Sequence, residues 1–197
     1  MKISVVVTAI GVALLTESAL AAGPNVQGAV QRDVNQQDRI EQGLKSGELT
    51  TKEAGRLERQ EAKIERTEAR DVKRDGGLTK ADQAHITRMQ DSASADIYRD
   101  KHNGAAGNPD SASSKRMQAD VQRDANREKR IGQGAKSGSL TNGEVSSLER
   151  GEARVDQKEA RDARDGHVSA REQAGIRKAG KRQSHRIHHA KHDGRGS

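Results

Sequence analysis

Histidines gather near the C-terminal end of this 197-residue chain, with a spacing that could bind a metal ion. Four of the seven histidines lie within eight residues, at positions His185, His188, His189 and His192. If a helix continues here, spacings of three and four residues place three of them on one face. Neutral imidazoles in that arrangement are ligands for copper, nickel or zinc. The alternative is a solvated basic helix whose histidines add only polarity and pH-dependent charge.

The same segment is strongly basic. Between residues 175 and 197, seven lysines and arginines stand against one acid, and the whole chain has a formal net charge of +7. Dispersed positive charge can contact anionic groups without reading a sequence, which makes client proteins or the anionic surfaces of a cell envelope candidate partners. Nucleic acid is a less natural partner, because an aromatic content of 1% leaves few side chains for base stacking.

A second set of metal-binding candidates lies in the string DVKRDGGLTKAD, residues 71 to 82. Its length and glycine position resemble the calcium loop of EF-hand proteins. The residues at loop positions one, five, nine and twelve are Asp71, Asp75, Thr79 and Asp82. The resemblance implies calcium ligation by these four. Lys73 replaces the expected ligand at position three, however, so calcium is less favoured than copper, nickel or zinc.

The chain contains an internal duplication. QRDVNQQDRIEQGLKSGELT, residues 31 to 50, aligns without a gap with QRDANREKRIGQGAKSGSLT, residues 122 to 141. We therefore divide the chain into one helical repeat unit at 24 to 103 and a second at 115 to 193. The segment between them, residues 104 to 114, is rich in glycine and serine and predicts a flexible linker.

Each unit repeats a pattern that ends one helix and starts the next. A glycine suited to the left-handed conformation is followed by a serine or threonine that forms a capping box with an acid. The predicted boxes are Thr50 with Glu53, Thr79 with Asp82, Thr141 with Glu144, and Ser169 with Glu172. The predicted helices run near 25 to 45, 50 to 73, 79 to 102, 115 to 136, 141 to 164 and 169 to 192. We expect an all-α protein of two tandem EF-hand-like three-helix units, partly disordered because large apolar residues are few.

A weaker resemblance connects the chain to periplasmic helical-hairpin proteins that carry LTxxQ motifs. Those proteins act as stress chaperones or metal-responsive sensors. The dipeptides that match the start of this motif are Leu49-Thr50, Leu78-Thr79 and Leu140-Thr141. An acid replaces the glutamine of the motif in each of them, so this resemblance adds a function class and no ligand.

The sequence gives little support to catalysis. It contains no thiol nucleophile, GxSxG elbow, P-loop or HExxH motif. Glu58 and Glu61 lie in RLERQEAKIERTEARD, where acids and bases alternate at helical spacing. We interpret these acids as an exposed helix face supported by ion pairs. The protein is therefore expected not to be an enzyme.

The first 22 residues predict a secretory signal peptide. Lys2 precedes an apolar run that is too short to span a bilayer, and small residues at Ala19 and Ala21 suit cleavage. Because the chain has no cysteine, a lipid anchor and disulfides are excluded. We expect a periplasmic or secreted protein that is not transmembrane after cleavage.

These patterns together predict an exported helical binding protein that buffers or senses metal ions. The alternative is a metal-independent envelope stress or chaperone-like protein. It would hold client proteins or anionic surfaces with its charged helices.

Overall fold

The computed structural model describes residues 23 to 194, which form six α-helices and no strand. The helices are α1 Pro24–Ser46, α2 Thr51–Asp75, α3 Lys80–Lys101, α4 Ala112–Ser137, α5 Asn142–Asp162 and α6 Ala170–Ala190. The prediction of an all-α fold is confirmed. Within the described range, no helix has an apolar stretch long enough to cross a bilayer. The predicted signal peptide lies outside the described residues.

Local sequence signals set most of the helix ends, as predicted, although α5 ends at Asp162 with Ala163, and not a glycine, as its C-cap. The helices α1, α2 and α4 end at Gly47, Gly76 and Gly138, whose φ angles of 80°, 69° and 76° suit a residue without a Cβ. All four predicted capping boxes form. In the first, the backbone N–H of Glu53 donates to the Thr50 hydroxyl at 3.2 Å, and the Thr50 N–H donates to the Glu53 carboxylate at 2.9 Å.

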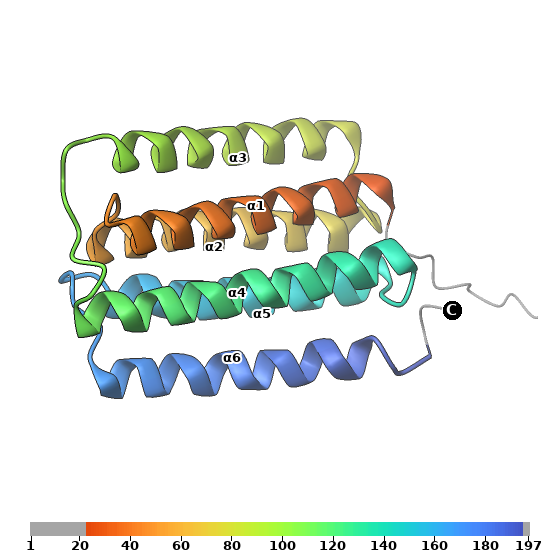
Figure 1. Ribbon diagram of the computed structural model, residues 1–197. Coiled ribbons are helices and arrows are strands. Elements are labelled where there is room, and N and C mark those ends of the chain that lie inside the picture. The colour runs from red at the N-terminus through yellow and green to blue at the C-terminus, as the bar shows by residue number, and fades with distance from the viewer. Residues whose placement is uncertain (1–22, 195–197) are drawn as a thin grey trace, which may run out of the picture.

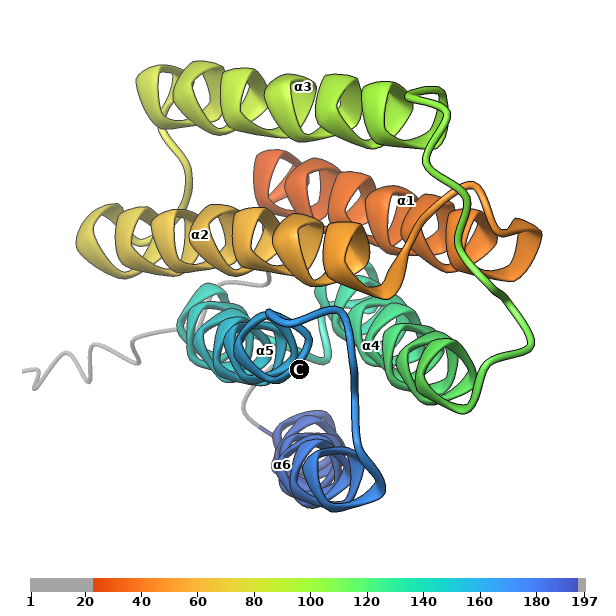
Figure 2. The same cartoon turned by 90° about the vertical axis from the view of Figure 1, so that its left-hand side faces the viewer.

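The helices stack in four layers (Figure 1). Helix α3 covers α1 and α2, this pair packs on α4 and α5, and α6 covers the far side of α4 and α5 (Figure 2). The most extensive contacts join the two halves of the chain, since α2 packs along α5 and α1 along α4. Both apolar clusters of the core also draw residues from both halves. The halves therefore share one core.

Small residues let the central helices approach closely. A Cβ atom placed on Gly55 of α2 would lie 2.6 Å from the Cβ of Ala163, just after α5. A Cβ on Gly132 of α4 would lie 3.4 Å from a methyl carbon of Val30 on α1. This packing shuts the inward faces of α1, α2, α4 and α5 away from solvent.

The segment between α3 and α4 contacts the turn that follows α1. The N–H of Gly107 donates to the carbonyl oxygen of Gly47 at 2.8 Å, and the Gln118 side chain donates to the carbonyl oxygen of Pro109 at 2.9 Å. Helix α4 begins at Ala112, so the end of the predicted linker is helical. These contacts tie the segment to the turn after α1 and to α4.

Candidate metal centre

Twelve acidic side chains are buried between the four central helices, and each is at most 2% exposed. They are Asp33 on α1, Glu58, Glu61, Glu65 and Glu68 on α2, Asp120, Asp124 and Glu128 on α4, and Glu149, Glu152, Asp156 and Glu159 on α5. We call this set the carboxylate array. Carboxylates in a protein interior are costly unless protons, cations or hydrogen-bond donors compensate them.

The interpretation of Glu58 and Glu61 as an exposed helix face is wrong. Their exposed fractions are 0% and 1%. The four array acids of α2 follow one another at spacings of three, four and three residues, which keeps them on a single helix face. The bases between them, such as Arg59 and Lys63, point to solvent. Acids and bases do alternate at helical spacing, but the acidic face is the one that packs inward.

Most of the array has no positively charged partner. Within residues 23 to 194, nine of its members make no ion pair. The three exceptions are Asp120, which pairs with Arg123, and Asp124 and Glu152, which both pair with Arg127. Buried acids outside the array are compensated differently, as Asp100 is by Arg56 and Arg99.

Several carboxylates of the array also lack hydrogen-bond donors. Both oxygens of Glu61, Glu128 and Glu149 are buried without a partner among the described residues. Buried polar atoms in proteins are almost always hydrogen-bonded, so oxygens without partners indicate a missing ligand or proton.

Burial raises the pKa of most carboxyl groups of the array. It raises the pKa of Asp33 to about 7 although Gln90 donates a hydrogen bond, and that of Glu58 to about 7 although Gln37 does. At Glu149, burial and then the charges of Glu128 and other carboxylates raise the pKa well above its usual range. At neutral pH the array therefore retains protons or needs cations in their place.

Three groups within the array bring carboxylate oxygens within 4.8 Å of one another. The groups are Asp33, Glu68 and Glu149; Glu65, Glu128 and Glu149; and Asp124, Glu152 and Asp156. The first two share Glu149, whose two oxygens both lack donors, so each oxygen can serve one group. We call the five residues of these two groups the Glu149 centre, and the third the Asp124 group.

The ligand atoms of these groups are all oxygens. In the part of the chain that the structure describes, no such group includes a histidine. Carboxylate oxygens favour hard cations such as Ca²⁺, Mg²⁺, Mn²⁺ and Fe³⁺ over the softer copper. Metal sites in helix bundles are also made from side chains of facing helices, as these groups are. The arrangement can therefore hold hard cations inside the bundle.

The four predicted histidine ligands lie on the exposed side of the C-terminal segment. All four are exposed, and the rings of His188 and His192 stack with centroids 4.4 Å apart. Nδ1 of His192 lies 2.7 Å from the carbonyl oxygen of His188. In the first half, the rings of Tyr98 and His102 stack in the same way with centroids 4.1 Å apart. This ring stacking therefore does not require two imidazoles. Copper, nickel or zinc binding here stays a prediction.

The four residues of the predicted calcium loop are brought together around Arg74. Its guanidinium contacts Asp71 at 3.1 Å, Asp75 at 2.7 Å and Asp82 at 2.7 Å. The Thr79 hydroxyl donates to Asp82 at 2.6 Å, and hydrogen bonds from Thr79 and then Arg74 lower the pKa of Asp82 to about 2. A guanidinium thus already pairs with these three carboxylates, and calcium binding at this loop stays a prediction.

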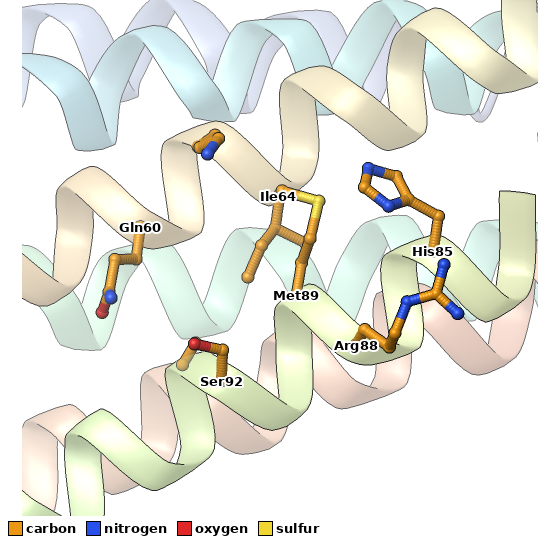
Figure 3. A pocket seen from close by; sticks show the side chains of 8 residues that line it. Gln60, Ile64, His85, Arg88, Met89 and Ser92 are labelled. Carbon is orange, nitrogen blue, oxygen red and sulfur yellow. The ribbon is translucent and has the colours of Figure 1, made fainter.

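A surface pocket of about 300 Å³ between α2 and α3 offers different chemistry (Figure 3). Ile64 and Met89 form its apolar part, while Lys63, His85 and Arg88 supply basic groups. Its lining contains no carboxylate. It does not provide the hard oxygen ligands of the array.

One signal in the sequence could have revealed the array. Each array acid of α2 has an acid 91 positions later on α5, although many of the other aligned residues of these two helices differ. The pairs are Glu58 and Glu149, Glu61 and Glu152, Glu65 and Asp156, and Glu68 and Glu159. A search of family models, of curated proteins and of solved structures finds no match to this chain.

Proposed function

We propose that this protein binds two hard cations at the Glu149 centre and acts as a metal-ion buffer or sensor. The observation that carries the proposal is the pair Glu128 and Glu149, which are 0% and 1% exposed and whose four carboxylate oxygens lack donors. A cation would satisfy these oxygens and cancel their mutual repulsion at once.

Charge balance supports two cations at this centre. The Glu149 centre carries five carboxylates, and none of them has an ion-pair partner in the described residues. Two divalent cations bring four positive charges and two trivalent cations bring six, so either pair nearly neutralises the centre. Glu149 would bridge the two ions through its two oxygens.

The predicted compartment and the duplication belong to the same proposal. We place the protein in the periplasm or outside the cell on the strength of its first 22 residues. The two EF-hand-like units, residues 24 to 103 and 115 to 193, would each supply two helices to the array, so that duplication created the centre. The metal-independent chaperone-like role stays the alternative prediction.

Replacing Glu65, Glu128 and Glu149 together with glutamine is expected to abolish hard-cation binding. Glutamine keeps the shape of each side chain but removes the negative charge that a cation requires. Calorimetric titration with Mn²⁺ and with Ca²⁺ at pH 7.5 should show two ions per wild-type chain, with Kd below about 1 mM for at least one of these metals, and none for the variant.

Two control variants separate this centre from the surface. The triple variant Asp38→Asn, Asp91→Asn and Asp110→Asn removes the same charge from side chains that are 43%, 65% and 87% exposed, and should keep both ions. Substituting the four histidines of the C-terminal segment with alanine should also leave Mn²⁺ and Ca²⁺ binding unchanged. A wild-type chain that binds neither metal would refute the proposed function.

A further inference from the structure

We call the part of the carboxylate array around Asp33 its first end and the part around Asp124 its second end. The two ends have different neighbouring side chains at positions that correspond in the duplication. Asp33 of α1 corresponds to Asp124 of α4, which lies 91 residues later. By the same offset Gln36 corresponds to Arg127. In the third helix of each half, where the offset is 90 residues, Gln90 corresponds to Gly180. A neutral pair of glutamines in the first half is thus replaced by an arginine and a glycine in the second.

At the first end, the two glutamines provide hydrogen bonds but no charge. The Gln90 amide donates to Asp33 at 2.9 Å and to Glu68 at 3.1 Å. The Gln36 amide donates to the backbone carbonyl oxygen of Gln90 at 2.7 Å. The carboxyl groups at this end, which belong to the Glu149 centre, therefore receive hydrogen bonds from neutral amides and no positive charge.

At the second end, a buried guanidinium takes the place of the glutamines. Arg127 is 4% exposed, pairs with Asp124, and donates from Nε to the two carboxylate oxygens of Glu152 at 3.0 and 2.8 Å. A Cβ on Gly180 would lie 2.8 Å from Nη1 of Arg127. The glycine thus provides the space that the arginine occupies, and the two changes between the halves depend on each other.

We propose that the guanidinium of Arg127 is a resident cation that fills the Asp124 group, so that exchangeable cations bind only at the Glu149 centre. This inference rests on the proposed function and assigns its stoichiometry. Arginine keeps its charge at every pH at which the protein folds, so its occupation of the group is permanent.

The surface pockets next to the two ends of the array differ in their content of basic residues, and this difference supports the assignment. A pocket of about 480 Å³ lies over Arg127 between α4 and α6, and its lining also includes Arg123, Arg130, Arg177 and Lys181. The pocket of about 160 Å³ that contains Gln90 has one basic residue, Arg32. Concentrated positive charge repels approaching cations. Entry of a cation into the array is therefore less favourable through the pocket over Arg127, at the second end, than through the pocket that contains Gln90, at the first end.

The variant Arg127→Gln tests the inference by copying the first half into the second. We expect it to bind three Mn²⁺ ions per chain where the wild type binds two, counted by native mass spectrometry at pH 7.5. Arg127→Lys keeps a positive charge and should still bind two. The double variant Arg127→Gln with Gly180→Gln restores both glutamines of the first half and should also bind three.

The difference between variant and wild type tests Arg127, whereas the wild-type count alone tests the proposed function. No gain of an ion in Arg127→Gln and in the double variant would overturn the inference even if the wild type binds two. A gain of one ion over a wild type that binds none would uphold the resident cation and refute the Glu149 centre. If Arg127→Gln unfolds in chelator, refolding on addition of Mn²⁺ supports the inference, and failure to refold contradicts it.

Discussion

Removing bound cations with a chelator at pH 7.5 is expected to lower the melting temperature of the wild-type protein by about 10 to 20 °C. Each cation present at 100 times its Kd stabilises the folded state by about 2.7 kcal/mol, so two contribute about 5 kcal/mol. For a chain of this size, 1 kcal/mol shifts the melting temperature by about 2 to 4 °C. The loss is large because the chelator leaves the five carboxylates of the Glu149 centre facing one another.

Thermal unfolding followed by circular dichroism, with Mn²⁺ and then with excess chelator, measures this shift. The triple variant Glu65→Gln, Glu128→Gln and Glu149→Gln is the matched control. It should melt at the same temperature under both conditions, and in chelator it should melt above the wild type because three buried charges have been removed. Equal melting of the wild type with and without Mn²⁺ would contradict the account.

The cation-free protein is expected to be most stable near pH 4 to 5 and to lose stability as the pH rises toward 8. Burial raises the pKa of Asp33 from 3.8 and that of Glu58 from 4.5, in both cases to about 7. Between the ordinary and raised pKa the folded state binds more protons than the unfolded state, so rising pH favours unfolding. At about 1.4 kcal/mol per pKa unit, ionisation costs about 3.5 kcal/mol at Glu58 and about 4.5 kcal/mol at Asp33.

Below pH 4 the sign reverses. Hydrogen bonds from Thr79 and then Arg74 lower the pKa of Asp82 to about 2, and this stabilisation is lost as the pH falls through that value. Urea unfolding in chelator at intervals from pH 3 to 8 measures both limbs of the profile. A free energy of unfolding that stays level or increases between pH 5 and 8 would show that the array carboxyls have ordinary pKa values.

The helix ends could be predicted from the sequence because their causes are local. Gly47 must adopt a positive φ, and Thr50 with Glu53 closes its box within four residues, so no knowledge of the tertiary structure is needed. The same reasoning located the turn at Gly76 and the box of Thr79 with Asp82. These signals gave the number, order and approximate length of the helices.

The candidate site could not be predicted in this way because its geometry depends on how distant helices pack. A helix with acids on one face and bases on another has the same sequence pattern whichever face turns inward. In this protein Gly55 and Ala163 bring α2 and α5 so close that Glu58 and Glu61 are enclosed, although a glutamate with its ordinary pKa would be charged at neutral pH. The usual rule that charged residues face water therefore predicts the wrong orientation for the acidic face of α2.

The repetition of acids at 91-residue spacing is visible in the sequence, and exposed ion pairing is a weak explanation for it. Ion pairs on a helix surface are worth only a few tenths of a kcal/mol, which gives little reason to keep four acids at four matching positions. The departures from the repeat carry further information, since Gln36 and Gln90 in one half become Arg127 and Gly180 in the other. These differences can be interpreted only from the structure, which shows that both pairs of residues lie next to buried carboxylates.

A crystal structure of the wild-type protein grown with Mn²⁺, with anomalous diffraction measured near the manganese absorption edge, tests the central claim most directly. The account predicts two anomalous peaks on either side of the Glu149 carboxylate. One should lie among Asp33, Glu68 and Glu149, and the other among Glu65, Glu128 and Glu149. An interior without anomalous peaks, in crystals whose surface carries bound manganese, would contradict it.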